Sequence, residues 1–139
     1  NYGLILGWVC VKNQIDIIPI IFYLGAIFWI LGFDTIYGFQ DINDDEIIGI
    51  KSTSIKFKKN SKLFLILCYT IFITVLTIVG LIMKFNKIFY FFMLIPIFHL
   101  FFYQIYNFNP KDPKNILKIF KSNNLLGALI LSNIFIGKI

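Results

Sequence analysis

The stretch LFLILCYTIFITVLTIVGLIM, residues 63–83, lies between Lys62 and Lys84 and contains 21 residues without a charge. A helix of roughly 20 apolar residues crosses the hydrocarbon core of a bilayer, which is about 30 Å thick. The stretch lacks the strict alternation of a membrane β-strand, and in lipid a helix satisfies all of its own backbone hydrogen bonds. It therefore predicts a transmembrane helix.

Three more uncharged runs have the same character, at residues 17–33, 88–110 and 122–137. Together with the first stretch they predict four full spans, near residues 16–40, 62–83, 88–108 and 122–138, and residues 2–12 predict the end of a fifth. Pro19 and Pro96 fall inside two of the spans and are expected to kink them. The expected fold is an all-α, multi-spanning transmembrane helix bundle.

The composition also indicates a membrane protein. Hydrophobic residues make up 58% of the chain and charged residues 14%, whereas a soluble domain has about a quarter charged residues. All 13 basic residues are lysines, and alternating spans place nine of them in or beside residues 42–61 and 107–121 and four on the other side. The positive-inside rule predicts that both long connectors are cytoplasmic. The net charge of +6 then reflects topology and anionic lipid, and no nucleic-acid partner is expected.

Residues 113–121 precede the last predicted span and have their own pattern. Lys114, Lys118 and Lys121 recur at i, i+4 and i+7, with apolar residues elsewhere on the helical wheel. Two interpretations remain open. The segment is a short helix lying in the membrane interface, or it is a lead-in turn whose lysines extend toward the headgroups.

Cys10, Cys68 and His99 lie in apolar surroundings. The two cysteines are far apart in sequence and predict neither a disulfide framework nor a clustered zinc site, so we expect both to be apolar residues that face lipid or the bundle. For His99 we expect a hydrogen-bonded residue of the bundle. A proton-relay role is the alternative.

An acidic stretch, GFDTIYGFQDINDDE at residues 32–46, carries five of the seven acidic side chains and begins at the end of an apolar span. Carboxylates at membrane depth are costly and usually functional. On a continuous helix Asp34, Asp41 and Asp45 fall on one stripe, with Asp41 and Asp45 each about 20° from Asp34, on opposite sides of it. Such like charges repel, so a cation is expected among them, and hard divalent cations take oxygen ligands. The alternative is a solvated helix end with ordinary surface acids.

A calcium loop is excluded for this stretch. Asp41, Asn43 and Asp45 match the start of an EF-hand. The sixth position should be glycine and is Glu46, and the twelfth should be glutamate and is Ser52.

Lys51 follows the acidic stretch, together with a glycine and two hydroxyl side chains: Gly49, Ser52 and Thr53. This combination suits a loop that binds phosphate beside a metal site. Lys51 is otherwise one more lysine on the positive side of the membrane.

Residues 34–55, DTIYGFQDINDDEIIGIKSTSI, resemble the second aspartate-rich motif of the UbiA prenyltransferases. The resemblance is strongest to the 4-hydroxybenzoate polyprenyltransferase branch, with its pattern D-x-x-Y-A-x-x-D-x-x-D-D followed by I-G-x-K-S-T. Gly38 stands where the branch has alanine, one small residue for another. Residues 120–127, FKSNNLLG, resemble the F-x-x-N-N-x-x-G sequence that opens the final helix of the branch.

The resemblance implies nine helices around a central cavity, with two aspartate-rich motifs that bind Mg²⁺ and the diphosphate of a polyprenyl donor. The chain matches the end of helix five and helices six to nine. The first motif, N-D-x-x-D-x-x-x-D, has no counterpart in it. Residues 1–139 are therefore expected to be the C-terminal part of a single membrane domain, inactive alone. Asn1 opens within a hydrophobic run without a preceding basic segment, which predicts a start inside a helix and not a signal peptide.

The activity implied by the resemblance is Mg²⁺-dependent transfer of a polyprenyl group from polyprenyl diphosphate to 4-hydroxybenzoate. The new bond forms at the ring carbon ortho to the hydroxyl, in ubiquinone biosynthesis, in the bacterial or mitochondrial inner membrane. Metal ligands would be Asp34, Asp41 and Asp45, with Asp34, Tyr37 and Asp41 as the catalytic residues. Tyr37 would face the developing allylic cation or bond to a phosphate or carboxylate.

Residues implied to bind the diphosphate are Lys51, Asn123 and Asn124. For the two asparagines the alternative is a helix start, since asparagine is a preferred N-cap. Two rival functions remain. One is a UbiA prenyltransferase acting on another aromatic acceptor, in menaquinone, tocopherol or haem O synthesis. The other is a membrane ion transporter, which predicts mid-span carboxylates and internal repeats.

Overall fold

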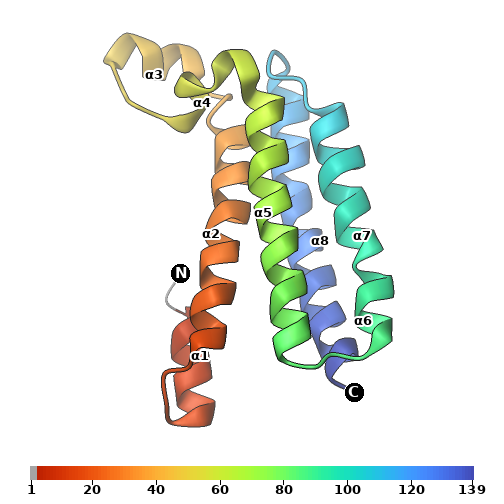
Figure 1. Cartoon of the computed structure of the whole chain (residues 1–139). Helices are drawn as coiled ribbons and strands as arrows, with labels where there is room; N and C mark the ends of the chain where they lie inside the picture. The colour runs from red at the N-terminus through yellow and green to blue at the C-terminus, as the bar shows by residue number, and fades with distance from the viewer. Residues whose placement is uncertain (1–2) are drawn as a thin grey trace.

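Four helices are long and apolar enough to cross a membrane: Ile17–Gly38, Lys58–Ile82, Lys87–Ile105 and Pro113–Lys138. They come from a computed structural model that describes residues 3–139, and within those residues it contains helices and no strand. Figure 1 shows the four running along a common direction as one bundle. The predicted all-α transmembrane fold is confirmed, and the chain is a multi-pass integral membrane protein.

The elements in chain order are α1 (Gly3–Lys12), α2 (Ile17–Tyr37), α3 (Ile42–Ile48), α4 (Thr53–Lys56), the 3₁₀ helix η1 (Lys58–Asn60), α5 (Ser61–Ile82), α6 (Lys87–Phe92), α7 (Leu94–Phe98), the π-helix η2 (His99–Ile105) and α8 (Pro113–Lys138). Helix α1 accounts for the described part of the predicted segment 2–12, whose first residue lies outside the described range. Helix α5 packs chiefly against α2, and α8 packs against α2 and α6.

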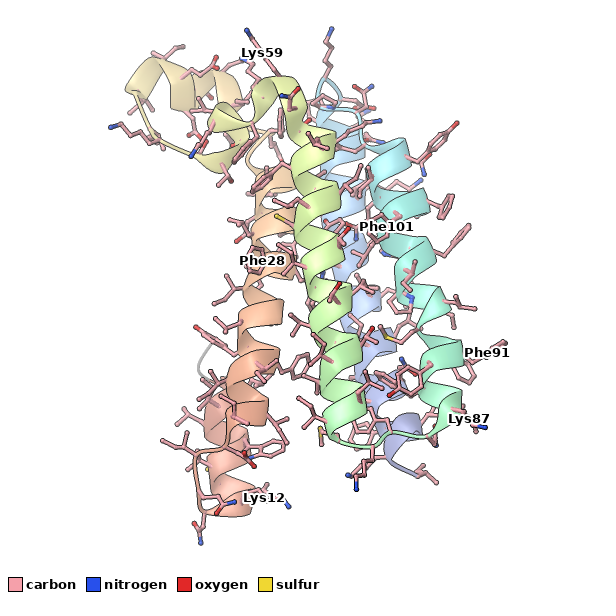
Figure 2. All side chains as sticks on the ribbon, in the orientation of Figure 1. Lys12, Phe28, Lys59, Lys87, Phe91 and Phe101 are labelled. Carbon is pink, nitrogen blue, oxygen red and sulfur yellow. The ribbon has the colours of Figure 1, made fainter. Side chains whose placement is uncertain are left out.

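The two longer connectors lie at one end of the bundle and the short α5–α6 turn at the other (Figure 1). Lys59 marks the first end, and Lys12 and Lys87 mark the opposite end (Figure 2). Between them, Phe91 points away from the helices, as expected for a side chain that faces lipid (Figure 2). This arrangement has the alternation that the lysine pattern requires. The cytoplasmic location of the first end stays a prediction.

Glycines let α2 approach α5 closely. A Cβ added at Gly25 would lie 2.6 Å from a methyl carbon of Val75, and one added at Gly32 would collide with the ring of Tyr69. Small residues allow this kind of contact between membrane helices. As a result, the buried rings of Tyr69 and Phe72 can pack between the spans as part of the core.

The two prolines behave differently. Pro19 lies in the first turn of α2, where its missing N–H would have no helical partner in any case, so the expected kink there is wrong. The third span is irregular around Pro96: α6 ends at Phe92, α7 contains the proline, and a π-helix follows from His99. Because proline cannot donate to the carbonyl four residues earlier, this irregularity agrees with the prediction for Pro96.

The segment 113–121 is neither a separate interfacial helix nor a turn. It forms the first turns of α8, which continues without a break from Pro113 to Lys138. Asp112 caps the helix by accepting a hydrogen bond from the N–H of Lys114 at 3.0 Å, and proline is well suited to the first helical position. The lysines therefore lie on the first turns of the spanning helix itself.

Candidate functional site

The acidic stretch is not a single helix. Helix α2 ends at Tyr37, the chain turns through residues 38–40, and α3 begins at Ile42 with Asp41 at its N-cap position. The predicted stripe of Asp34, Asp41 and Asp45 is therefore wrong, because a helical wheel has no meaning across the break. Within residues 3–139 no three His, Cys, Asp or Glu side chains lie close enough to hold a metal ion.

Two of these carboxylates, those of Asp34 and Asp41, nevertheless lack an ion-pair partner among the described residues. Asp34 and Asp41 are exposed at the end of the bundle, although Asp34 still belongs to a membrane-spanning helix. In the described part of the chain the only ion pair joins Lys58 to Glu46, at 2.8 Å. Both aspartates therefore remain open to a cation from outside the described structure.

A hydroxyl contact ties the Lys51 loop to the end of α2. The Oγ1 atoms of Thr35 and Thr53 lie 2.7 Å apart. Thr35 donates its proton to the carbonyl of Leu31 at 2.6 Å, so Thr53 is the donor to Thr35. The contact places Thr53 next to the last turn of α2, which also carries Asp34.

The segment 52–54 also packs on the turn at Gly38. Ser54 is buried, its Oγ is 2.8 Å from that of Ser52, and Ser52 Oγ accepts from the N–H of Ile55 at 3.3 Å. A Cβ at Gly38 would lie 2.6 Å from Ser54 Oγ. The glycine is therefore a packing requirement here, and the alanine of the related pattern would need more space than Ser54 leaves.

Lys51 lies in the loop between α3 and α4, just after Gly49, whose φ of 80° suits glycine. The lysine is exposed and lines a shallow pocket of about 480 Å³ with Ser52 and Thr53. Its ammonium group has no ion-pair partner among the described residues. This is an open cationic position beside two hydroxyl side chains.

A groove of about 400 Å³ lies between α2 and α8, and we call it the aromatic groove. Its lining residues are Ala26, Trp29, Ile30, Phe33, Phe120, Asn123, Asn124, Gly127 and Ala128.

Aromatic rings connect this groove to the acidic end of α2. The ring centroids of Trp29 and Phe33 lie 5.8 Å apart, those of Phe33 and Phe120 also 5.8 Å, and those of Tyr37 and Phe120 4.7 Å. Tyr37 keeps 40% of its surface exposed. The series leads from membrane depth up to the turn that carries Asp34.

The two asparagines differ in their surroundings. Neither is a helix start, because α8 begins at Pro113, so that alternative is wrong. Asn123 is buried, and its Oδ1 accepts from Trp29 Nε1 and from Gln104 Nε2, each at 3.0 Å. Its Nδ2 donates to the carbonyls of Phe120 at 3.1 Å and Ile119 at 3.4 Å. The Asn123 amide is thus used within the protein, whereas Asn124 is exposed on the groove.

Three polar groups that meet near the groove were not predicted from the sequence: Trp29, Tyr69 and Gln104. The two aromatic residues give no local signal within long apolar runs. Only Gln104 could have been recognised from the sequence, since a lone amide in a membrane span usually bonds to another helix. The expectation of a hydrogen-bonded His99 is confirmed, because its Nδ1 lies 3.4 Å from Gln104 Nε2. Cys10 and Cys68 are both free, as expected.

Residues 2–132 match the UbiA prenyltransferase family. The chain belongs to that family. As a UbiA chain it is 32% identical to the mitochondrial 4-hydroxybenzoate polyprenyltransferases of Bos taurus and Homo sapiens, each over 142 aligned residues that cover 100% of this chain and 38% of the relative. It is also 32% identical to the 4-hydroxybenzoate octaprenyltransferase of Francisella tularensis subsp. novicida (strain U112), covering 94% of this chain and 45% of the relative.

The UbiA chain spans less than half the length of these relatives. No solved structure matches it.

Proposed function

We propose that the protein transfers a polyprenyl group from polyprenyl diphosphate to the ring carbon ortho to the hydroxyl of 4-hydroxybenzoate, in ubiquinone biosynthesis. The observation that carries the proposal is the aromatic groove between α2 and α8, whose series of rings ends at Tyr37 on the last turn of α2, the turn that also carries Asp34, a carboxylate without an ion-pair partner among the described residues. A polyprenyl diphosphate would match this arrangement in two parts, because its apolar tail suits the groove and its charged diphosphate suits a metal held by carboxylates. The names of the related proteins support the acceptor and the class of donor.

Residues 1–139 would form the C-terminal part of one UbiA-type membrane domain. Support comes from the share of the relatives that the chain spans and from the second aspartate-rich motif that it carries. The remaining part of the domain would complete the walls of the cavity.

Mg²⁺ is the metal that suits the oxygen ligands available at the acidic end of α2. Asp34, Asp41 and Asp45 offer hard oxygen ligands, and Mg²⁺ is usually held by one or two carboxylates together with substrate phosphates. Since the described residues do not bring three such groups together, the diphosphate and other parts of the protein would supply the other ligands. When bound, the metal would neutralise charge on the diphosphate leaving group.

Side chains of this chain would bind the phosphate, stabilise the cation and exclude water. Lys51 would hold a phosphate oxygen, because its ammonium is exposed and free of an acidic partner among the described residues. The face of Tyr37 would stabilise the positive charge that develops on the allylic carbon. Asn124 would contact the donor near the diphosphate, and the apolar wall of the groove would keep water away from the cation.

The test is prenyl transfer in membranes that contain the whole protein, with a polyprenyl diphosphate and three competing acceptors. We expect prenylated 4-hydroxybenzoate to form, and its formation to require Mg²⁺. Preferential prenylation of homogentisate or 1,4-dihydroxy-2-naphthoate would refute the acceptor and keep the family. Ion flux without prenyl transfer in sealed vesicles would refute the enzyme and favour a transporter.

A further inference from the structure

A chain of hydrogen bonds crosses the interior of the bundle and ends at the wall of the aromatic groove. Tyr69 on α5 donates to Gln104 Oε1 at 2.7 Å, and Gln104 Nε2 donates to Asn123 Oδ1 at 3.0 Å. The same Oδ1 accepts from Trp29 Nε1 on α2. Tyr69 and Gln104 have no exposed surface. Four spans are therefore joined by side chains that the chemistry described above does not use.

The direction of every bond in this chain is set by one group. An indole N–H only donates, so Trp29 must face the oxygen of Asn123 and not its amide nitrogen. Gln104 must then present its NH₂ to Asn123, and its oxygen is left to accept from Tyr69. The Asn123 NH₂ points at backbone carbonyls, which only accept. All these assignments agree, so the side chains have a single satisfied arrangement.

Packing holds the indole of Trp29 from the other side. Its ring stacks on Phe72, with centroids 5.3 Å apart and planes 20° apart. Gly32 makes room for Tyr69 at the start of the chain, and Gln104 lies in the π-helix, a form that often marks functional sites. Across the groove, a Cβ at Gly127 would lie 3.4 Å from Trp29 Cη2. Trp29 is thus a fixed wall opposite small residues of α8.

We propose that Gln104 is a positioning residue that, through Asn123, fixes Trp29 as the wall against which the isoprenoid tail of the donor lies. The inference rests on the proposed function for the identity of the tail. The relay itself rests on the hydrogen bonds alone. Gln104→Leu removes one of the two donors to Asn123 Oδ1, so the amide that accepts from the indole is held less firmly and Trp29 is expected to shift.

The first experiment measures Trp29 without requiring activity. In the whole protein, with the other tryptophans replaced by phenylalanine, Gln104→Leu is expected to shift the emission maximum of Trp29. The matched control is Asn133→Leu. Asn133 is another buried amide on α8, without a hydrogen-bond partner among the described residues and lining a different cavity. The control is expected to leave the emission unchanged.

The second experiment measures the KM for the polyprenyl diphosphate. Loss of one neutral hydrogen bond predicts an increase of about threefold to tenfold in Gln104→Leu, with a smaller change in kcat. In a Trp29→Phe background the same substitution should raise KM no further, because its effect passes through the indole. Effects that multiply across the two substitutions would overturn the proposal. If Gln104→Leu does not fold, Tyr69→Phe, which removes only the outer hydroxyl, is expected to act in the same direction but less.

The two ideas fail in different ways. Unchanged emission and KM in Gln104→Leu, in a protein that still prenylates 4-hydroxybenzoate, would overturn the positioning role and keep the function. A wild-type protein without prenyl transfer would refute the function. The emission of Trp29 would still decide whether Gln104 positions it.

Discussion

Replacing Gly38 by alanine should destabilise the junction between α2 and the Lys51 loop. The new Cβ would lie 2.6 Å from Ser54 Oγ, 3.2 Å from Ser54 Cβ and 3.4 Å from the carbonyl of Asp34. The backbone itself tolerates alanine, since Gly38 has φ −62° and ψ −11°. The cost therefore comes from the contact with Ser54 and not from strain in the turn.

The magnitude follows from what Ser54 can do. Its hydroxyl is buried and held 2.8 Å from Ser52 Oγ, so turning away from the new methyl group breaks that contact. Overpacking costs about 1–3 kcal/mol, and a lost hydrogen bond about 1 kcal/mol more. Replacing glycine by alanine in a helical conformation returns about 0.5–1 kcal/mol. We expect a net loss of about 1–3 kcal/mol in unfolding free energy.

The assay is unfolding in detergent of four proteins: wild type, Gly38→Ala, Ser54→Ala and the double variant. Ser54→Ala removes the clashing oxygen, so the double variant should be more stable than Gly38→Ala alone. Gly7→Ala is the matched control, because a Cβ there meets nothing within 4 Å and should stabilise α1. Equal stability of Gly38→Ala and Gly7→Ala, or no rescue by Ser54→Ala, would refute the reasoning.

Three other predictions test the metal site, the topology and a buried amide. Asp34→Asn and Asp41→Asn should each lower the rate of prenyl transfer about a hundredfold or more, which corresponds to about 2.7 kcal/mol, with unchanged protein level. Glu46→Gln, the control, should not lower the rate. Near-normal Mg²⁺-dependent turnover in Asp41→Asn would show that the acidic stretch is a solvated helix end. In a background without native cysteines, Lys59→Cys should resist an impermeant outside reagent in intact cells, and its labelling would reverse the topology. Asn133→Leu should raise the unfolding midpoint, because it removes an amide without partners among the described residues; a lower midpoint would mean that the amide is satisfied.

The spans could be predicted from sequence because one physical rule decides them: lipid excludes charge, and the lengths of the uncharged runs match its thickness. The continuity of α8 was missed for a related reason. The lysines at the start of α8 indicate where the helix enters the membrane interface. They do not indicate whether the helix ends at that point. Nothing between Pro113 and the apolar run breaks a helix, and the structure continues through it.

The hydrogen bonds around Gln104 could not be predicted, because helix packing alone creates them. Trp29 and Asn123 are 94 positions apart, and Tyr69 and Gln104 are 35 apart. In the sequence, nothing next to any of these side chains indicates its hydrogen-bond partner. Only the close approach of α5 to Gly25 and Gly32 of α2, together with the turn of the π-helix, brings the four groups within bonding distance.

The break after Tyr37 changes what the acidic stretch can do. On a continuous helix Asp34 and Asp45 would be separated by about 16 Å along the axis, at about 1.5 Å per residue. No single Mg²⁺ bridges that distance, since its ligands lie about 2.0–2.1 Å away. The turn at residues 38–40 instead sends α3 sideways from the bundle (Figure 1). Asp34 is left exposed on the last turn of α2, and Lys51 is exposed on the loop whose Thr53 contacts that same turn. Gly38, Ser54 and the Thr35–Thr53 contact hold those segments together, and the site therefore depends on the turn that a helical wheel ignores.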